Sequence, residues 1–167
     1  MAKTLIISSS LNPDSKSFKI CKMVVKHMQK RGSDVELLDI RDYELGHTFR
    51  TTPDMQKISN KISQADNFII GMAVYCYSVN DSLKTILDNC FEDVTGKKYG
   101  IVCAAGGEKS YLSTQHLTQI CANEWRMIQL PRVVYTSGKD WADGELVSAD
   151  VSERVELFVN EFIEFVS

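Results

Sequence analysis

The chain has 167 residues, of which 44% are hydrophobic and 25% are charged, close to the average of soluble globular domains. Its formal net charge of −3 gives no electrostatic support for a nucleic-acid partner. No apolar run approaches the roughly 18–20 residues of a membrane span, and the N-terminus lacks the layout of a signal peptide. We therefore expect a cytoplasmic protein with no membrane partner, built as a single domain over residues 1–167.

Strand-like and helix-like patterns alternate along the chain. An apolar run predicts a strand over 3–8. A helix over 16–30 follows, with apolar residues on one stripe from Phe18 to Met28. Further strands are expected over 34–39, 67–72, 99–104 and 127–135, and further helices over 52–64, 80–92, 110–123 and 150–166. The remaining long segment, 136–149, is expected to be an irregular excursion on the surface.

This alternation predicts an α/β fold, a three-layer sandwich with helices on both faces of a five-stranded parallel sheet. Residues 68–72 are continuously apolar, as in a strand buried on both faces. Right-handed crossovers leave few topologies, and the strand order 2-1-3-4-5 is the leading candidate. In that order ligands bind beyond the carboxyl ends of the first and third strands.

Hydroxyl groups are concentrated in the loop after the first strand, at Ser8, Ser9, Ser10, Ser15 and Ser17. A loop of this kind that opens onto a helix N-terminus is a natural phosphate site, because the first amides of a helix lack partners inside the helix. The alternative is that Ser15 or Ser17 only caps the helix. Asn12 could reach the phosphate or support a turn before Pro13.

Two further loops are expected at the same rim. The one after the third strand contains Tyr75, Cys76, Tyr77 and Ser78, and the one after the fourth contains a Gly-Gly pair at 106–107. Tyrosine side chains and closely approachable glycine backbone suit a flat aromatic ligand. The alternatives are surface aromatics, an N-cap at Ser78 and a plain tight turn. A phosphate joined to an aromatic ring system describes a mononucleotide such as FMN.

These segments resemble the NADPH-dependent FMN reductase family of flavodoxin-like proteins. Residues 9–17 match the frame of its first-loop motif G-S-L-R-x-x-S-x-S/N. Residues 73–88 keep the Tyr, Ser, Leu-Lys and Leu-Asp positions of its third-strand motif, and Gly106-Gly107 match the first of its glycine pairs. The resemblance covers about residues 3–135. It departs at Asn12, where the family usually has Arg, at Ala73, Asn80 and Asp81, and at 108–110.

The resemblance implies an FMN-dependent NAD(P)H oxidoreductase with NAD(P)H as co-substrate. Hydride would pass from the nicotinamide to flavin N5, and electrons would pass on to a small-molecule acceptor such as a quinone, an azo compound or free flavin. It also implies a homodimer or homotetramer. No side chain is required as a catalytic acid or base. The residues expected to bind the cofactor are Ser9, Ser10, Asn12, Ser15, Lys16, Ser17, Ala73, Val74, Tyr75, Cys76, Tyr77, Ser78, Ala105, Gly106 and Gly107.

Alternative functions are a flavodoxin-like electron carrier and a family member that binds FMN or a partner without redox turnover. A phosphoacceptor receiver shares the topology, but it needs an acidic cluster after the first strand, where this chain has serines. No metal site is expected, because the three histidines are far apart and none of the five cysteines forms a C-x-x-C pair.

Overall fold

Five parallel strands form the central sheet of the computed structural model, which describes residues 2–167. Their order is β2-β1-β3-β5-β6, which is the predicted 2-1-3-4-5 order once the short antiparallel β4 is set aside. The strands are β1 (Thr4–Ser8), β2 (Val35–Asp39), β3 (Asn67–Tyr75), β4 (Ser78–Val79), β5 (Lys98–Ala104) and β6 (Ile128–Thr136).

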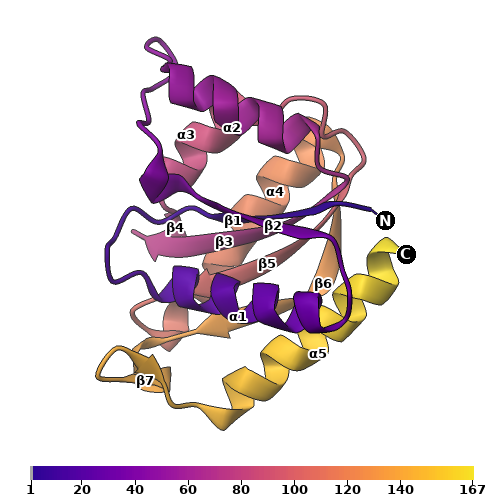
Figure 1. The fold of residues 1–167 in the computed structure, drawn as a ribbon. Helices are drawn as coiled ribbons and strands as arrows, with labels where there is room; N and C mark the ends of the chain where they lie inside the picture. The colour runs from indigo at the N-terminus through magenta and orange to yellow at the C-terminus, as the bar shows by residue number, and fades with distance from the viewer. Residues whose placement is uncertain (1) are drawn as a thin grey trace.

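Helices cover both faces of the sheet (Figure 1). On one side lie α2 (Pro53–Ser63), α3 (Asp81–Cys90) and α4 (Thr114–Trp125), and on the other lie α1 (Lys16–Lys30) and α5 (Ala149–Val166). Each face has its own apolar cluster, and alternate residues of β3 belong to different clusters: Phe68 and Ile70 to the first, Ile69 to the second. This accounts for the continuously apolar sequence of β3.

A glycine in β3 allows α1 to lie close to the sheet. A Cβ atom at Gly71 would come within 2.4 Å of Cys21 Sγ and 3.0 Å of the Ile7 carbonyl oxygen. The beginning of α1, where the first loop enters the helix, is therefore held against the centre of the sheet.

Three segments differ from the sequence-based expectation. The third strand continues to Tyr75 and folds back as β4. The fourth helix begins at Thr114, after a 3₁₀ segment over Glu108–Ser113. The segment 136–149 is not irregular throughout, because β7 (Trp141–Ala142) and β8 (Glu145–Leu146) form a hairpin whose Trp141 packs into the cluster under α1 and α5.

The strand β6 lies at one edge of the sheet. It contains Pro131, and the carbonyl oxygen of Val133 accepts a hydrogen bond from Arg154 Nε of α5 over 2.7 Å. Within residues 2–167, no helix is long and apolar enough to cross a membrane.

Candidate functional site

The carboxyl ends of β1, β3 and β5 meet at one rim, on the left in Figure 1, and enclose a pocket of about 360 Å³. This volume lies in the range of about 300–1,000 Å³ that is common for small-molecule sites. The predicted residues that line it are Ser10, Asn12, Ser15, Lys16, Ser17, Ala73, Val74, Tyr75, Ala105 and Gly106. The structure thus brings most of the expected residues together, and adds Asp14 and Ala104 to the lining.

The N-terminus of α1 opens into this pocket. Ser15 is its N-cap, with Oγ accepting from the Phe18 amide over 3.1 Å and lying 3.0 Å from Ser17 Oγ. The amides of Lys16 and Ser17 have no hydrogen-bond acceptor in the described part of the chain. Capping and anion binding therefore use different amides here, and two donors remain for an anion.

Asn12 and Lys16 contribute differently to the pocket. Asn12 Oδ1 accepts from the Asp14 amide over 2.9 Å, so its side chain supports the turn around Pro13. Lys16 lines the pocket, and its Nζ lies 5.7 Å from the ring centroid of Trp141, a cation–π contact with a residue that does not line it. Lys16 is therefore the cationic side chain among the residues that line this pocket.

A second pocket of about 450 Å³ adjoins the first and shares Val74 and Gly106 with it. The turn of the β3–β4 hairpin forms one wall. Its two central residues, Cys76 and Tyr77, have positive φ values of 49° and 60°, the geometry of a tight hairpin turn. The turn leaves Tyr77 63% exposed beside the pocket.

The glycine loop forms the opposite wall and is fixed by residues 135–139. The Ala105 amide donates to the Thr136 carbonyl over 2.9 Å, and the Gly138 amide donates to the Gly106 carbonyl over 3.1 Å. The hydroxyl of Tyr135 donates to the Gly107 carbonyl, and burial raises the pKa of Tyr135, which keeps this donor protonated. No heavy atom lies within 4 Å of a Cβ built at Gly106, so open space faces this backbone.

Two predicted residues face elsewhere. Ser9 is fully buried, and its Oγ donates to the Gly71 carbonyl over 2.6 Å, beneath the loop rather than in either pocket. Ser78 Oγ lies 2.9 Å from His116 Nδ1 of α4 and lines a different hollow.

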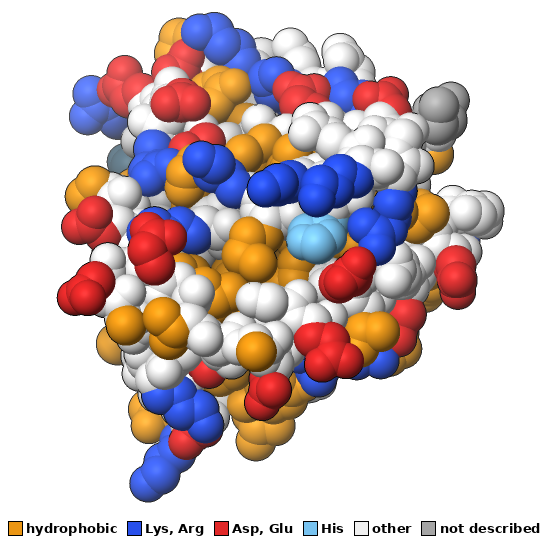
Figure 2. Space-filling model, turned by 60° about the horizontal axis from the view of Figure 1, so that its bottom comes forward, with side chains coloured by type: hydrophobic (Ala, Val, Ile, Leu, Met, Phe, Trp, Pro, Cys, Tyr) orange, Lys and Arg blue, Asp and Glu red, His pale blue; other side chains and the backbone are white. Residues whose placement is uncertain are grey.

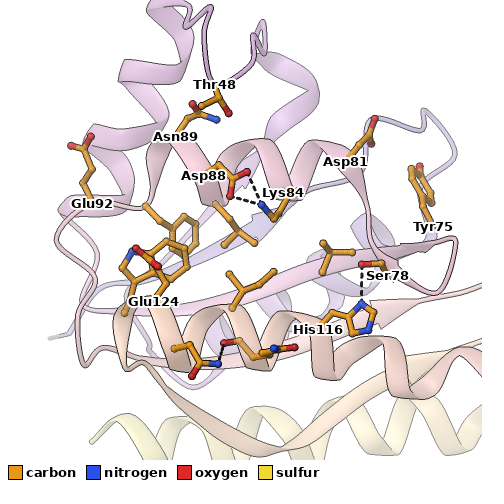
Figure 3. Close-up of a pocket in the computed structure, with 17 residues that line it drawn as sticks. Thr48, Tyr75, Ser78, Asp81, Lys84, Asp88, Asn89, Glu92, His116 and Glu124 are labelled. Carbon is orange, nitrogen blue, oxygen red and sulfur yellow. Dashed lines mark hydrogen bonds and ion pairs between the residues drawn. The ribbon is translucent and has the colours of Figure 1, made fainter.

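That hollow is a groove of about 1250 Å³ between α3 and α4 (Figure 3). Its apolar residues include Leu87, Phe91, Ile120 and Trp125, and an ion pair joins Lys84 to Asp88 over 2.7 Å at its side. Tyr75 lies at one end and also lines the first pocket, so the groove reaches the rim.

Sequence reasoning missed the residues that support the loops from below. Arg41 contacts the first loop, Asn80 lies beneath it, and Gly138 supports the glycine loop. Asn80 through its side chain, and Gly138 through its backbone amide, bind backbone groups that come close only in the fold. Arg41 follows the second strand, which pairs in parallel with the first. Because the ends of adjacent parallel strands lie side by side, the predicted strand order could have placed Arg41 near the first loop.

Comparison with known proteins identifies the family. Residues 2–142 match the model of the NADPH-dependent FMN reductase family. The chain belongs to this family. It is 28% identical to an NAD(P)H-dependent FAD/FMN reductase of Geobacillus thermodenitrificans, over 73% of this chain and 70% of the relative. An FMN-dependent NADPH-azoreductase of Staphylococcus saprophyticus is 25% identical, over 98% of this chain and 95% of that protein.

Among solved structures, the apo form of an NADH:FMN oxidoreductase superposes with a TM-score of 0.82 at 17% identity, covering 100% of this chain and 91% of that one. This likeness shows the shared flavodoxin-like fold. The family assignment and the fold thus agree with the expectation from the loop motifs.

Proposed function

We propose that this FMN reductase family member binds FMN across the loops 9–17, 73–78 and 104–110 and passes electrons from NAD(P)H to a small-molecule acceptor. The observation that carries the proposal is the union of two adjoining pockets at Val74 and Gly106. One pocket offers free helix amides and hydroxyl groups, which suit a phosphate. The other has open glycine backbone on one side and tyrosine on the other, which suits a flat ring system.

The chain's residues then have distinct tasks. Ser10, Ser15 and Ser17, together with the free amides of α1, hold the phosphate, and Lys16 supplies positive charge beside it. The backbone of 73–75 and 105–107 orients the ring. Bound FMN supplies a hydride acceptor for nicotinamide and a donor of electrons to the second substrate. We assign no side chain as an acid or base.

Basic side chains lie along one face of α1, although the chain as a whole is acidic. The partly or fully exposed lysines of α1 recur along the helix, at Lys16, Lys19, Lys22, Lys26 and Lys30. The space-filling view shows a row of basic side chains across this face of the molecule (Figure 2). Such a row raises the local concentration of phosphate-bearing molecules, including FMN and NAD(P)H.

The decisive experiment is FMN addition to the purified protein, followed by NADH or NADPH without oxygen. We expect the visible spectrum of the flavin to shift on binding and to bleach with a nicotinamide. Absence of binding would overturn the proposal. Binding without bleaching by either nicotinamide would instead support an electron carrier or a family member without turnover.

We propose further that a second copy of the chain covers the groove between α3 and α4, giving a homodimer. The support is the apolar floor of the groove and its contact with the rim at Tyr75. Charge introduced by Ile120→Glu should shift the mass in light scattering toward the 18.9 kDa monomer, whereas Ile128→Glu, at an exposed position on β6, should not. A wild-type monomer at high concentration would contradict the dimer.

We also propose a cytoplasmic location. All five cysteines are free thiols, and four of them are buried. Burial raises the pKa of Cys21, Cys103 and Cys121 to about 12, so these thiols stay protonated and unreactive. A chain with five unpaired thiols suits a reducing compartment, and fractionation of cells with an antibody to the protein would test this.

A further inference from the structure

Beneath the rim, the side chain of Asn80 connects the first loop to the end of β3. Asn80 is fully buried, although it is the residue that precedes α3. Its Nδ2 donates to the Ser9 carbonyl over 2.9 Å, and its Oδ1 accepts from the Ala73 amide over 3.0 Å. One side-chain amide therefore binds the backbone at the start of both loops.

The position explains the need for such a link. The pairing of β1 with β3 ends at Ser8 and Gly71, where the chain turns away into the first loop. Just beyond this point, the side-chain amide of Asn80 lies between the two segments. It accepts from the Ala73 amide and donates to the Ser9 carbonyl. The orientation of the amide is fixed, because a carbonyl needs a donor and an amide N–H needs an acceptor.

Neighbouring serines complete the buried network. Ser82 Oγ donates to the Ser9 carbonyl over 2.7 Å and accepts from Asn80 Nδ2 over 2.8 Å. Asn80 makes no capping bond to α3, and Asp81 Oδ1 instead accepts from the Ser82 amide over 2.8 Å. Asparagine at this position usually caps the helix, but the Asn80 side chain instead binds backbone groups at the ends of β1 and β3.

We propose that Asn80 is a positioning residue that fixes the phosphate loop relative to the ring loop, so that a flavin phosphate and its ring system are bound cooperatively. The inference rests on the proposed FMN site. A ligand that contacts both loops binds more tightly when their relative position is already fixed, because less conformational entropy is lost on binding. Riboflavin lacks the phosphate and gains less.

The test compares FMN with riboflavin. Asn80 has φ −65° and ψ 150°, and φ −65° is the value that the ring of proline imposes. Asn80→Pro therefore keeps the backbone and removes the whole side-chain link. We expect FMN affinity to fall roughly five- to tenfold more than riboflavin affinity, the size expected for loss of one net hydrogen bond or more.

Asn67→Leu is the matched control, because Asn67 is a buried asparagine at the opposite end of β3. It should not change the ratio of the two affinities, whatever its effect on the unfolding midpoint. A purely structural role for Asn80 predicts the same result for Asn80→Pro, and an unchanged ratio in that variant would overturn the proposal. Absence of FMN binding by the wild-type protein would instead refute the proposed function.

If Asn80→Pro does not fold, Ser82→Ala decides the question. It removes two bonds of the network and leaves Asn80 within reach of Ser9. The ratio of FMN affinity to riboflavin affinity should then fall by about two- to threefold. An unchanged ratio would overturn the proposed role of the Asn80 network.

Discussion

Arg41 Nη1 donates to the carbonyl oxygen of Pro13 over 3.1 Å, which ties the segment after β2 to the tip of the first loop. The guanidinium is itself fixed. Its Nε lies 2.9 Å and 3.0 Å from the two carboxylate oxygens of Asp39, and its centre lies 4.0 Å from the ring centroid of Phe18. Asp39 also raises the pKa of Arg41, so its charge persists at every working pH. The first loop is therefore held from the outside by Arg41.

Replacing this arginine should loosen the loop. Arg41→Met keeps most of the apolar stem and removes the bond to Pro13, so we expect FMN to bind about three- to tenfold more weakly, as for a lost hydrogen bond. Titration of flavin fluorescence measures the change. Arg31→Met, at the far end of α1 and paired with Glu156, removes the same charge and should have little effect. Equal losses in both variants would indicate a general charge effect.

Restoring a cation at position 12 should strengthen phosphate binding. An arginine there can make a charge-assisted contact, typically about 1.5–3 kcal/mol against about 0.5–1.5 kcal/mol for a neutral hydrogen bond. Asn12→Arg should therefore raise FMN affinity by about 5–30-fold. The loss of the hydrogen bond from the Asp14 amide to Asn12 reduces this gain. Riboflavin should be nearly unaffected. Equal tightening of both flavins would show that this loop does not face the phosphate.

The glycine loop predicts two different outcomes for similar changes. A Cβ at Gly106 meets no atom within 4 Å, so Gly106→Ala should leave the stability of the unliganded protein within about 1 kcal/mol while blocking the ring. A Cβ at Gly138 would lie 2.8 Å from the Gly106 carbonyl oxygen, so Gly138→Ala should lower both stability and FMN affinity. Urea unfolding and flavin titration separate the two. Undiminished FMN affinity in Gly106→Ala would place the ring elsewhere.

The pairing of Glu36 predicts a loss of stability in acid. Hydrogen bonds from Lys3 and Lys61 hold the pKa of Glu36 below its ordinary value of 4.5. Because the folded-state pKa lies below the unfolded one, this contribution is present above about pH 4.5 and is lost as the pH falls through the folded value. For so accessible a cluster it amounts to about 1 kcal/mol or less.

The measurement is the urea midpoint at pH 7 and at pH 3. Glu36→Gln should lower the midpoint at pH 7, and its effect should be smaller at pH 3. Glu156→Gln is the control, since Glu156 is 56% exposed in its pair with Arg31 and should matter less at either pH. An identical pH response in the wild type and Glu36→Gln would contradict the assignment.

Much of the fold could be predicted because its signals are local. Alternating periodicity set the order of strands and helices, and the serine-rich loop before Phe18 marked where α1 begins. The β3–β4 hairpin could not be predicted in this way, because Cys76 and Tyr77 are not residues that favour its left-handed turn.

The candidate site was predictable where its residues line a pocket and was not where they support one. Ser10 and Ser15 carry a motif, whereas Asn80 acts on Ser9, 71 positions away in the sequence. The inward turn of Ser9 follows from that contact and from Gly71. No pattern within one segment predicts this contact, because it forms only when β1 and β3 pair in the folded sheet.

The edge formed by β6 also limits how copies of this chain can associate. Proline at 131 has no N–H to offer to an added strand, and the Val133 carbonyl already accepts from Arg154. Exposed sheet edges are where foreign strands add and fibrils begin. Because Pro131 and Val133 interrupt this edge at nearby positions, growth of the sheet by added strands is disfavoured on the β6 side.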